Sequence, residues 1–342
     1  MEIISKYDSV LPWQTVQWNR LISQANNNSL PHAFLFSGQQ GIGKTQFAEN
    51  LAAFLLCEDS ASSAKPTIAC GRCKQCKLFQ AETHPDFKLI QPEDGSSSIK
   101  VDQIRSLVEF FGHSSQQGGR KVTILAPAES LNINAANALL KTLEEPSLNS
   151  VIILISHQAG MLLPTIRSRC QVVDFALPAE SESLAWLMGQ EAVKQKYSQA
   201  ELQQMLRLAY QAPFKALDYL DIQALTEYQT MLDELSVFLK NEKLSTELAT
   251  RWNDDLAQLR LSWMLLWLEQ LLKLKLKSGT VSLIHGEKMF HYLVSKCTAQ
   301  QFFELYAECL QQYRLFLGTS NPNKTLAFEL LLHRWSALMR KN

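Results

Sequence analysis

An eight-residue segment, Gly38 to Thr45, has the spacing G-x-x-x-x-G-K-T of a phosphate-binding loop. It follows the apolar run 33–36 and precedes a segment whose large apolar residues recur on one helical face. The turn therefore lies between a strand and a helix, as the motif requires. Its backbone N–H groups can surround a phosphate, its lysine can reach the outer phosphates, and its threonine can hold Mg²⁺. The candidate ligands of ATP or ADP are Gly38, Gly41, Gly43, Lys44 and Thr45.

The acidic partner of such a loop is missing from its usual place. Hydrolysis needs a carboxylate at the end of a second strand to hold Mg²⁺, and a polar group to position the attacking water. The best candidate strand, 121–125, is followed by Ala126 and Pro127, and neither side chain can bind a metal. Glu129 comes later, on a different side of the following turn. We therefore expect a site that can bind a nucleotide without hydrolysing it.

Four of the seven cysteines are close in sequence: Cys57, then Cys70, Cys73 and Cys76 in two overlapping C-x-x-C steps. Such steps let backbone turns aim several thiolates at one point. Four thiolates satisfy tetrahedral Zn²⁺ with no open position, which is typical of a structural site. The alternatives are free buried thiols, or His84 in place of Cys57 as the fourth ligand. The remaining cysteines are far apart and are expected to be small core residues: Cys170, Cys297 and Cys309.

Two further places have side chains suited to phosphate. Ser156 ends an apolar run, at the carboxyl edge where open α/β sheets bind ligands. It either senses a γ-phosphate or is an ordinary strand-end hydroxyl. Arg167 and Arg169 stand on a loop before the last expected strand, and are either solvated charges or anion binders. An arginine supplied to a neighbour's nucleotide can accelerate hydrolysis by ~10³–10⁵.

The elements that must position these residues alternate between apolar strands and amphipathic helices. Strands are expected at 33–37, 87–91, 121–126, 151–156 and 171–175. This alternation predicts an α/β fold, with a parallel sheet covered by helices on both faces and the cysteine segment inserted after the first helix. A helix is expected from the N-cap Asn134 to Glu145, where Pro146 stops it.

After Pro178 the pattern is almost wholly helical. We expect three domains: a nucleotide-binding-like domain over 1–177 with the cysteine module at 57–76, a short helical domain over 178–220, and a longer one over 221–342. The apolar stretch 261–276 contains charged residues and is expected to be a buried helix.

Composition describes an ordinary globular protein, with 46% hydrophobic and 19% charged residues. The 33 basic and 33 acidic side chains cancel, which argues against a protein that holds nucleic acid by its overall field. Residues 1–6 have no long apolar core, so no signal peptide is expected. The cytoplasm is the expected compartment, and no membrane partner is expected.

Several short segments, read together, resemble one known family. They are Leu30-Pro31-His32-Ala33, the four clustered cysteines, His84-Pro85-Asp86, Val101-Asp102-Gln103-Ile104-Arg105, Asn137 to Pro146, and Ser168-Arg169-Cys170. In this order they resemble the clamp-loader subunits of the AAA+ class, most closely the non-motor subunit of the bacterial DNA polymerase III loader. The resemblance spans most of the first 178 residues, and the helical remainder matches in pattern and length only.

The resemblance implies an AAA+ P-loop domain with a zinc module, followed by a lid domain and a collar domain that oligomerises. It implies a rigid stator in a ring-like pentamer that opens a sliding clamp and places it on primed DNA. The implied partners are the delta and motor subunits and, indirectly, the clamp and the DNA. As part of a DNA polymerase holoenzyme, such a chain is not expected to be a competent ATPase or polymerase by itself.

The resemblance also implies roles for single residues. The Ser-Arg-Cys loop would project Arg169 into the ATP site of a neighbouring motor subunit. Tyr7, Leu11 and Pro12 fall where family members contact an adenine base, and Lys215 falls at the second sensor position. Two other functions remain open: an ATP-hydrolysing motor subunit that uses another acid such as Glu129 or Asp86, and a zinc-containing nucleotide-binding adaptor with no role in replication.

Overall fold

The computed structural model describes residues 10–61, 67–117, 119–194, 196–241, 245–279, 281, 283–317 and 322–339. The chain divides into two compact units, one formed by 1–199 with 209–217 and the other by 200–208 with 218–342. The division into three domains expected from the sequence stays a prediction.

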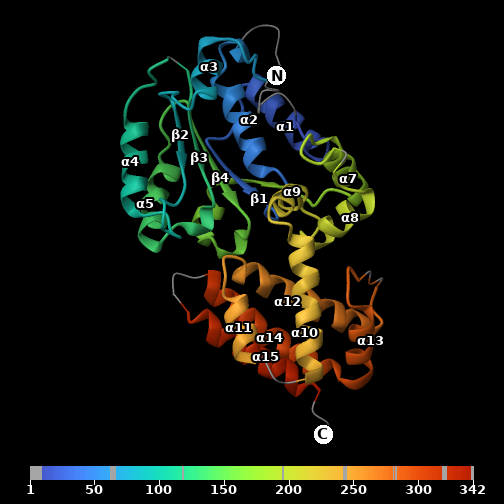
Figure 1. Cartoon of the computed structure of the whole chain (residues 1–342). Coiled ribbons are helices and arrows are strands. Elements are labelled where there is room, and N and C mark those ends of the chain that lie inside the picture. The colour runs from blue at the N-terminus through green and yellow to red at the C-terminus, as the bar shows by residue number, and fades with distance from the viewer. Residues whose placement is uncertain are drawn as a thin grey trace. The chain divides into compact units, whose positions relative to one another are not determined.

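The first unit is built on a five-stranded parallel sheet in the order β2-β3-β4-β1-β5 (Figure 1). Its strands are β1 (Ala33–Ser37), β2 (Phe87–Ile90), β3 (Lys121–Leu125), β4 (Ser150–Ser156) and β5 (Gln171–Asp174). Each bound lies within one residue of the strand expected from the sequence, because runs of β-branched and aromatic residues bounded by turn residues are a strong local signal. The expected α/β fold with a parallel sheet is confirmed.

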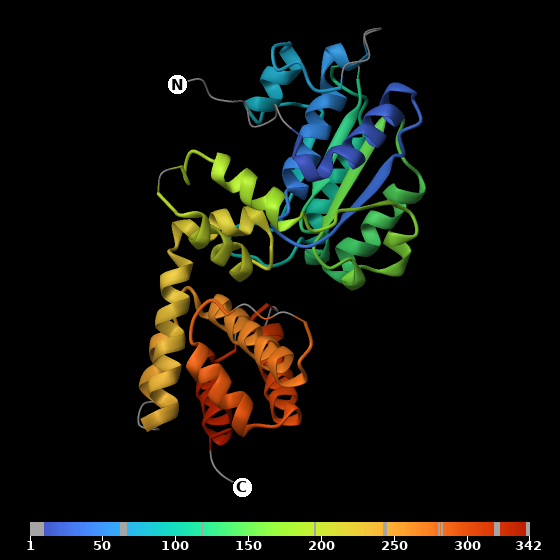
Figure 2. The ribbon, with the colours of Figure 1, turned by 90° about the vertical axis from the view of Figure 1, so that its right-hand side faces the viewer.

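Helices cover both faces of this sheet (Figure 2). Alternate residues of β1 belong to different cores: Phe34 and Phe36 pack with α1 (Thr15–Asn26) and α2 (Lys44–Leu56), and Leu35 packs with the helices of the opposite face. The strands are therefore apolar on both sides, as a sheet between two helical layers requires. The opposite face is covered by α4 (Val101–Gly112) and α5 (Ile133–Glu144).

The start of α5 differs from the expectation. The N-cap is Asn132 and not Asn134, because the Asn132 side chain accepts a hydrogen bond from the backbone N–H of Ala135. Both asparagines suit a cap, and only the course of the preceding loop decides between them. The helix ends at Glu144, before Pro146, as expected.

Short elements connect these parts. They are η1 (Pro12–Gln14), η2 (Glu58–Ala61), α3 (Lys74–Gln80), η3 (Ala128–Ser130), η4 (Ala159–Met161), α6 (Pro164–Arg167) and α7 (Glu180–Gly189). The segment 209–217, which contains the start of α9 (Pro213–Asp221), also belongs to the first unit. There the ring of Phe214 stacks against that of Trp186 on α7, with centroids 4.6 Å apart.

The described residues of the second unit form helices and connecting loops, with no strand. Its helices are α8 (Gln199–Leu208), α10 (Ala224–Asn241), α11 (Ser245–Trp252), α12 (Ala257–Leu276), α13 (Glu287–Lys296), α14 (Ala299–Leu317) and α15 (Lys324–Ala337), with the end of α9. Thirteen residues of α12 are buried, which confirms the expectation that the stretch 261–276 is a buried helix. Of the helices that the structure describes, none combines the length and the apolar composition of a membrane span.

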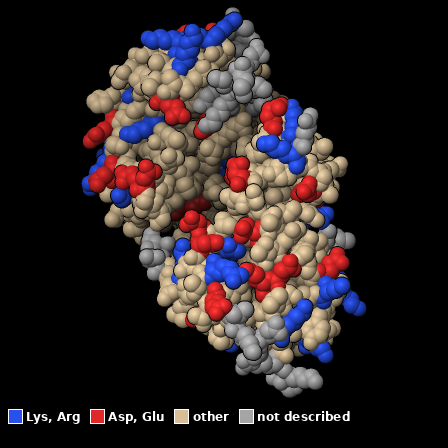
Figure 3. Space-filling view, in the orientation of Figure 1, with Lys and Arg blue, Asp and Glu red and all other residues tan. Residues whose placement is uncertain are grey.

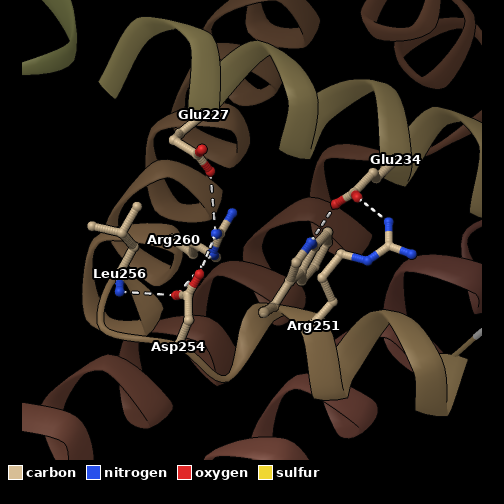
Figure 4. A network of polar contacts seen from close by, with 7 residues as sticks. Glu227, Glu234, Arg251, Asp254, Leu256 and Arg260 are labelled. Carbon is tan, nitrogen blue, oxygen red and sulfur yellow. Dashed lines mark hydrogen bonds and ion pairs between the residues drawn. The ribbon is translucent and has the colours of Figure 1, made fainter. Parts of the chain in front are cut away.

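A polar network joins three helices of this second unit (Figure 4). Arg260 on α12 pairs with Asp254 at 2.6 Å and with Glu227 on α10 at 3.3 Å. Glu234 on α10 accepts hydrogen bonds from Arg251 and from the indole N–H of Trp252. The arginine of α12 is buried, so its two acidic partners supply the compensation that a buried charge requires.

Charged side chains of both signs are interspersed on the face seen in Figure 3, with broad uncharged areas between them. A cluster of basic side chains lies over α3 in this view, but the described residues of this face carry no extended basic stripe. This distribution agrees with the zero net charge of the chain.

Candidate functional site

The P-loop connects β1 to α2, and two of its glycines have left-handed backbone conformations. Gly41 has φ of 81° and Gly43 has φ of 88°. A Cβ on Gly43 would lie 2.3 Å from Cδ1 of Leu11, and one on Gly41 would lie 2.7 Å from Cβ of Lys215. The loop is therefore packed between the N-terminal segment and the segment 209–217, at positions that only glycine can occupy without strain.

The N-terminal segment holds the loop from one side. The indole Nε1 of Trp13 and the amide Nε2 of Gln14 both donate to the backbone carbonyl of Ile42, at 3.0 and 2.9 Å. Pro12, which begins η1, is exposed next to them. Of the other two predicted adenine contacts, Leu11 is buried, and Tyr7 lies outside the described residues. Sequence reasoning missed both donors, because nothing local distinguishes them from other residues at the start of a helix.

The segment 209–217 holds the loop from the other side. The backbone N–H of Phe214 donates to the carbonyl of Gly41 at 2.9 Å, and Nε2 of Gln39 donates to the carbonyl of Tyr210 at 2.9 Å. The Lys215 ammonium lies 5.7 Å from the centroid of the Tyr210 ring, and burial lowers the pKa of this lysine. The structure thus brings the predicted sensor lysine to the P-loop, although the two are more than 170 residues apart in sequence.

Lys44 lies under the loop with 2% of its surface exposed. Its ammonium donates to the carbonyls of Gly38 and Gln39, both at 2.6 Å. Burial lowers the pKa of Lys44 to about 8, and the negative charge of Glu129 offsets part of that effect. To bind a phosphate, the Lys44 ammonium must therefore give up its hydrogen bonds to these two carbonyls. Thr45, the predicted Mg²⁺ ligand, is exposed at the start of α2.

The carboxyl edge of the sheet places two further polar residues beside this loop. Ser156 ends β4 opposite Ser37 of β1, and its buried hydroxyl accepts a hydrogen bond from the backbone N–H of Gln158 at 3.2 Å. Glu129 Oε1 accepts from the backbone N–H of His157 at 2.9 Å. Through this hydrogen bond the carboxylate of Glu129, which belongs to η3, lies at the end of β4.

Asp86, the other acid considered for hydrolysis, lies at the opposite edge. It directly precedes β2, and its carboxylate accepts from the Ser115 hydroxyl and from the backbone N–H groups of Gln116 and Gln117. All strands are parallel, so the start of β2 and the end of β1 lie at opposite ends of the sheet. Asp86 therefore cannot serve the P-loop of its own chain.

The four clustered cysteines meet in space. The sulfur atoms of Cys57, Cys70, Cys73 and Cys76 all lie within 4.8 Å of one another, a group that could hold a metal ion. Backbone N–H groups point at three of them: that of Cys70 at Cys57 Sγ, that of Cys73 at Cys70 Sγ, and that of Cys76 at Cys73 Sγ, at 3.3–3.4 Å. Such donors favour thiolates, the form that binds metals.

The electrostatics of this group and its relation to His84 agree with four cysteine ligands. Burial raises the pKa of the Cys57 and Cys76 thiols, a cost that a bound cation would offset. His84, the alternative fourth ligand, instead accepts from the backbone N–H of Asp86 through Nδ1 and does not belong to the group that the described residues form. The other three cysteines are buried, as expected: Cys170, Cys297 and Cys309.

Arg169 lies at the amino edge of the sheet, two residues before β5. Its guanidinium pairs with Glu144 at the end of α5 at 2.5 Å and donates to the carbonyl of Thr165 at 2.9 Å. One third of its side chain is exposed. In the register of β5 with β1, the start of the P-loop is level with Phe175, six residues beyond Arg169. That separation corresponds to about 20 Å along the strand direction.

Comparisons with known proteins assign the chain to a family. The model described as "DNA polymerase III, delta subunit" matches residues 13–179, and that described as "DNA polymerase III, delta subunit, C terminal" matches 223–337. A DNA polymerase III subunit delta' of Pseudomonas aeruginosa is 38% identical over 332 residues, covering 96% of this chain and 98% of that protein. Its counterpart in Escherichia coli K12 is 31% identical over 262 residues, covering 77% and 76%.

Among solved structures, a DNA polymerase III gamma subunit-related protein of Thermotoga maritima aligns with 96% of this chain and all of that chain, at 19% identity and a TM-score of 0.44. The sequence relationship to the delta' proteins extends over nearly the whole of both chains. The chain belongs to the family of DNA polymerase III delta' subunits.

Proposed function

We propose that this chain is the non-motor stator of a DNA polymerase III clamp loader, and that it supplies Arg169 to the ATP site of a neighbouring subunit. In this role it contributes to placing the sliding clamp on primed DNA. Its partners are the delta and motor subunits and, through them, the clamp and the DNA. The observation that carries the proposal is the position of Arg169, exposed in part at the amino edge of the sheet.

The position of Arg169 favours action on another chain. Its own P-loop begins about 20 Å away at the opposite end of β1 and β5. A guanidinium acts on a transferring phosphoryl group only within hydrogen-bond distance, so Arg169 cannot act on a nucleotide at Lys44. The contacts with Glu144 and Thr165 hold the guanidinium at the surface.

The P-loop supports the non-motor part of the proposal. Ala126 and Pro127 follow β3 where hydrolysis requires carboxylates, so the loop lacks the usual ligand for catalytic Mg²⁺. We propose that a nucleotide bound by Gly38 to Thr45, with Pro12, Ser156 and Lys215 near it, has a structural role. Tyr7 is proposed to contact the base from the N-terminal segment.

The remaining parts have structural roles in this proposal. Zn²⁺ held by the four clustered cysteines would fix the segment between α2 and α3, since four thiolates leave no position for a substrate. The first 177 residues form the nucleotide-binding-like domain, 178–220 the lid, and 221–342 the collar through which subunits associate.

The test is the ATPase activity of a loader reconstituted with the Arg169→Ala variant. Assembly is expected to be unchanged, while clamp- and DNA-stimulated hydrolysis falls by about tenfold or more, since an arginine finger contributes ~10³–10⁵ at a single site. Arg167→Ala is the matched control, because Arg167 is exposed two residues earlier on α6. An unchanged rate with Arg169→Ala would remove the finger assignment.

A specific observation also favours a second function, an ATP-hydrolysing motor. Lys44 and Thr45 complete the P-loop, and the structure brings Glu129 to the same edge of the sheet. ATP turnover by the isolated chain that is lost in a Lys44→Ala variant would support this function.

A further inference from the structure

The two carboxylate oxygens of Glu129 differ, because one accepts a hydrogen bond and the other has no donor among the described residues. Oε1 accepts the hydrogen bond from the backbone N–H of His157. Oε2 is buried and finds no hydrogen-bond donor among the residues that the structure describes. A buried carboxylate oxygen without a partner is costly, so the position calls for a cation or a donor that the chain itself does not provide.

The sheet topology places this carboxylate beside the P-loop. Glu129 follows β3, and β3 pairs with β4, so Leu125 lies opposite Leu154. By binding the N–H of His157, the carboxylate reaches the end of β4, one residue past Ser156. The next strand is β1, where Ser37 lies opposite Ser156 and leads directly into Gly38.

Glu129 also lies within electrostatic range of the P-loop lysine, since its negative charge raises the pKa of Lys44 against the larger effect of burial. Among the described residues this carboxylate is not in ion-pair contact with the Lys44 ammonium, which stays on the carbonyls of Gly38 and Gln39.

We propose that Glu129 provides the cation-binding carboxylate of this P-loop, in place of the acids that positions 126 and 127 lack. The ligand class is a nucleoside di- or triphosphate bound together with Mg²⁺. An uncomplexed polyphosphate would face the negative charge of Glu129, whereas its Mg²⁺ complex would be attracted to it. Mg²⁺ is bound in such sites through one or two carboxylates plus the phosphates of the nucleotide, and Glu129 would supply the carboxylate of that donor set.

This inference rests on the nucleotide site of the proposed function, and it does not depend on Arg169. It also differs from the motor function, because a single carboxylate that holds Mg²⁺ leaves the attacking water without a positioning base. A competing explanation is that Glu129 is only an internal counter-charge for Lys44. The two explanations predict different effects of Mg²⁺ on nucleotide affinity.

The experiment measures binding of ADP and of the non-hydrolysable analogue AMP-PNP to the full chain by calorimetry, with excess Mg²⁺ and with EDTA. For the wild type, Mg²⁺ is expected to raise the affinity by about tenfold or more, and Glu129→Gln is expected to reduce this gain to about twofold or less. In EDTA the same variant should bind at least as well as the wild type, because the repelling charge is gone.

Glu129→Gln is suited to this test because an amide oxygen can still accept from the N–H of His157. Glu145→Gln is the matched control, since Glu145 is exposed after α5 at the other edge of the sheet. Glu129→Asp, which keeps the charge, should retain a larger part of the Mg²⁺ gain than Glu129→Gln. Circular dichroism melting of each variant checks that the fold is kept.

Two results would overturn the inference. One is an equal Mg²⁺ gain in the wild type and in Glu129→Gln, which would leave Glu129 as a counter-charge and the nucleotide site intact. The other is no nucleotide binding by the wild type in either condition, which would remove the nucleotide site while leaving the Arg169 proposal unaffected.

Discussion

At the scale of single residues, the two cationic side chains considered for phosphate binding, Lys44 and Arg169, have opposite environments. Lys44 is buried under its own loop and bonded to two backbone carbonyls. Arg169 is part-exposed and held by one carboxylate and one carbonyl at the other end of the sheet. An exposed ion pair contributes only ~0–1 kcal/mol, so in the proposed function Arg169 leaves Glu144 for a neighbouring subunit's phosphate at little cost.

The buried lysine makes nucleotide binding dependent on pH. Phosphate binding needs the ammonium form, and burial lowers the pKa of Lys44 to about 8. We therefore expect the affinity for ADP to be flat below this pH and to fall as the pH rises above it, by up to about tenfold per unit. A Lys44→Met variant should bind weakly with no such step, and a flat wild-type profile up to pH 10 would contradict the prediction.

The same residue should act on stability in the opposite direction. Lys44 in the unfolded chain keeps its proton up to about 10.5, so between about pH 8 and 10.5 the unfolded state binds more protons than the folded state. Its contribution to the free energy of unfolding therefore rises over that interval, by at most about 3 kcal/mol. Urea unfolding of the wild type and of Lys44→Met across this range isolates the contribution.

At the scale of elements, what the sequence could predict follows the range of the interactions involved. The strands were predictable because alternation and turn residues are local, and the cysteine group because C-x-x-C spacing is itself a geometric constraint. The contacts of Ile42 with Trp13 and Gln14, and the return of Glu129 over β4, were not. They depend on how loops from different strands meet at one edge, which no local pattern records.

The cysteine module allows a test by metal content. Four sulfur atoms within 4.8 Å of one another should bind about one Zn²⁺ per chain. Cys70→Ser is expected to lower the zinc content to below half and to reduce the melting temperature, because metal binding contributes to folding. Cys297→Ser, which changes a buried cysteine of the second unit, should keep the zinc. Less than about half a zinc per wild-type chain would argue against four-thiolate ligation.

The polar network of the second unit gives a stability prediction. The Arg260 side chain is 6% exposed, and replacing it with methionine leaves Asp254 and Glu227 without their cation. The expected loss is about 1–3 kcal/mol of unfolding free energy, smaller than for a fully buried pair because both acids are part-exposed.

The control for this network is Arg251→Ala in the same group of helices. Arg251 is 64% exposed, and its partner Glu234 keeps the hydrogen bond from Trp252. Its loss should cost less than about 1 kcal/mol. If urea unfolding showed equal losses of unfolding free energy for Arg260→Met and Arg251→Ala, burial of Arg260 would not explain the size of its effect.

At the scale of the whole molecule, the sequence relationship to the delta' family covers nearly the full chain. The parallel sheet separates the P-loop from Arg169. Its carboxyl edge carries the P-loop, Ser156 and Glu129, and its amino edge carries Arg169. Because one sheet cannot bring its two edges together, Arg169 cannot reach a nucleotide bound at the P-loop of its own chain.

This separation leads to the final prediction, that the isolated chain turns over no ATP, even with primed DNA and clamp present. Its P-loop has no carboxylate at 126 or 127, and its own arginine cannot reach the nucleotide. Glu129 can hold a cation but leaves the attacking water unactivated, so binding is separated from hydrolysis. Phosphate release measured in parallel with ADP binding tests this, with Lys44→Ala as the control. ATP turnover that disappears in that variant would make this chain a motor. Because Arg169 cannot reach its own P-loop, another subunit would then have to supply the arginine for that site.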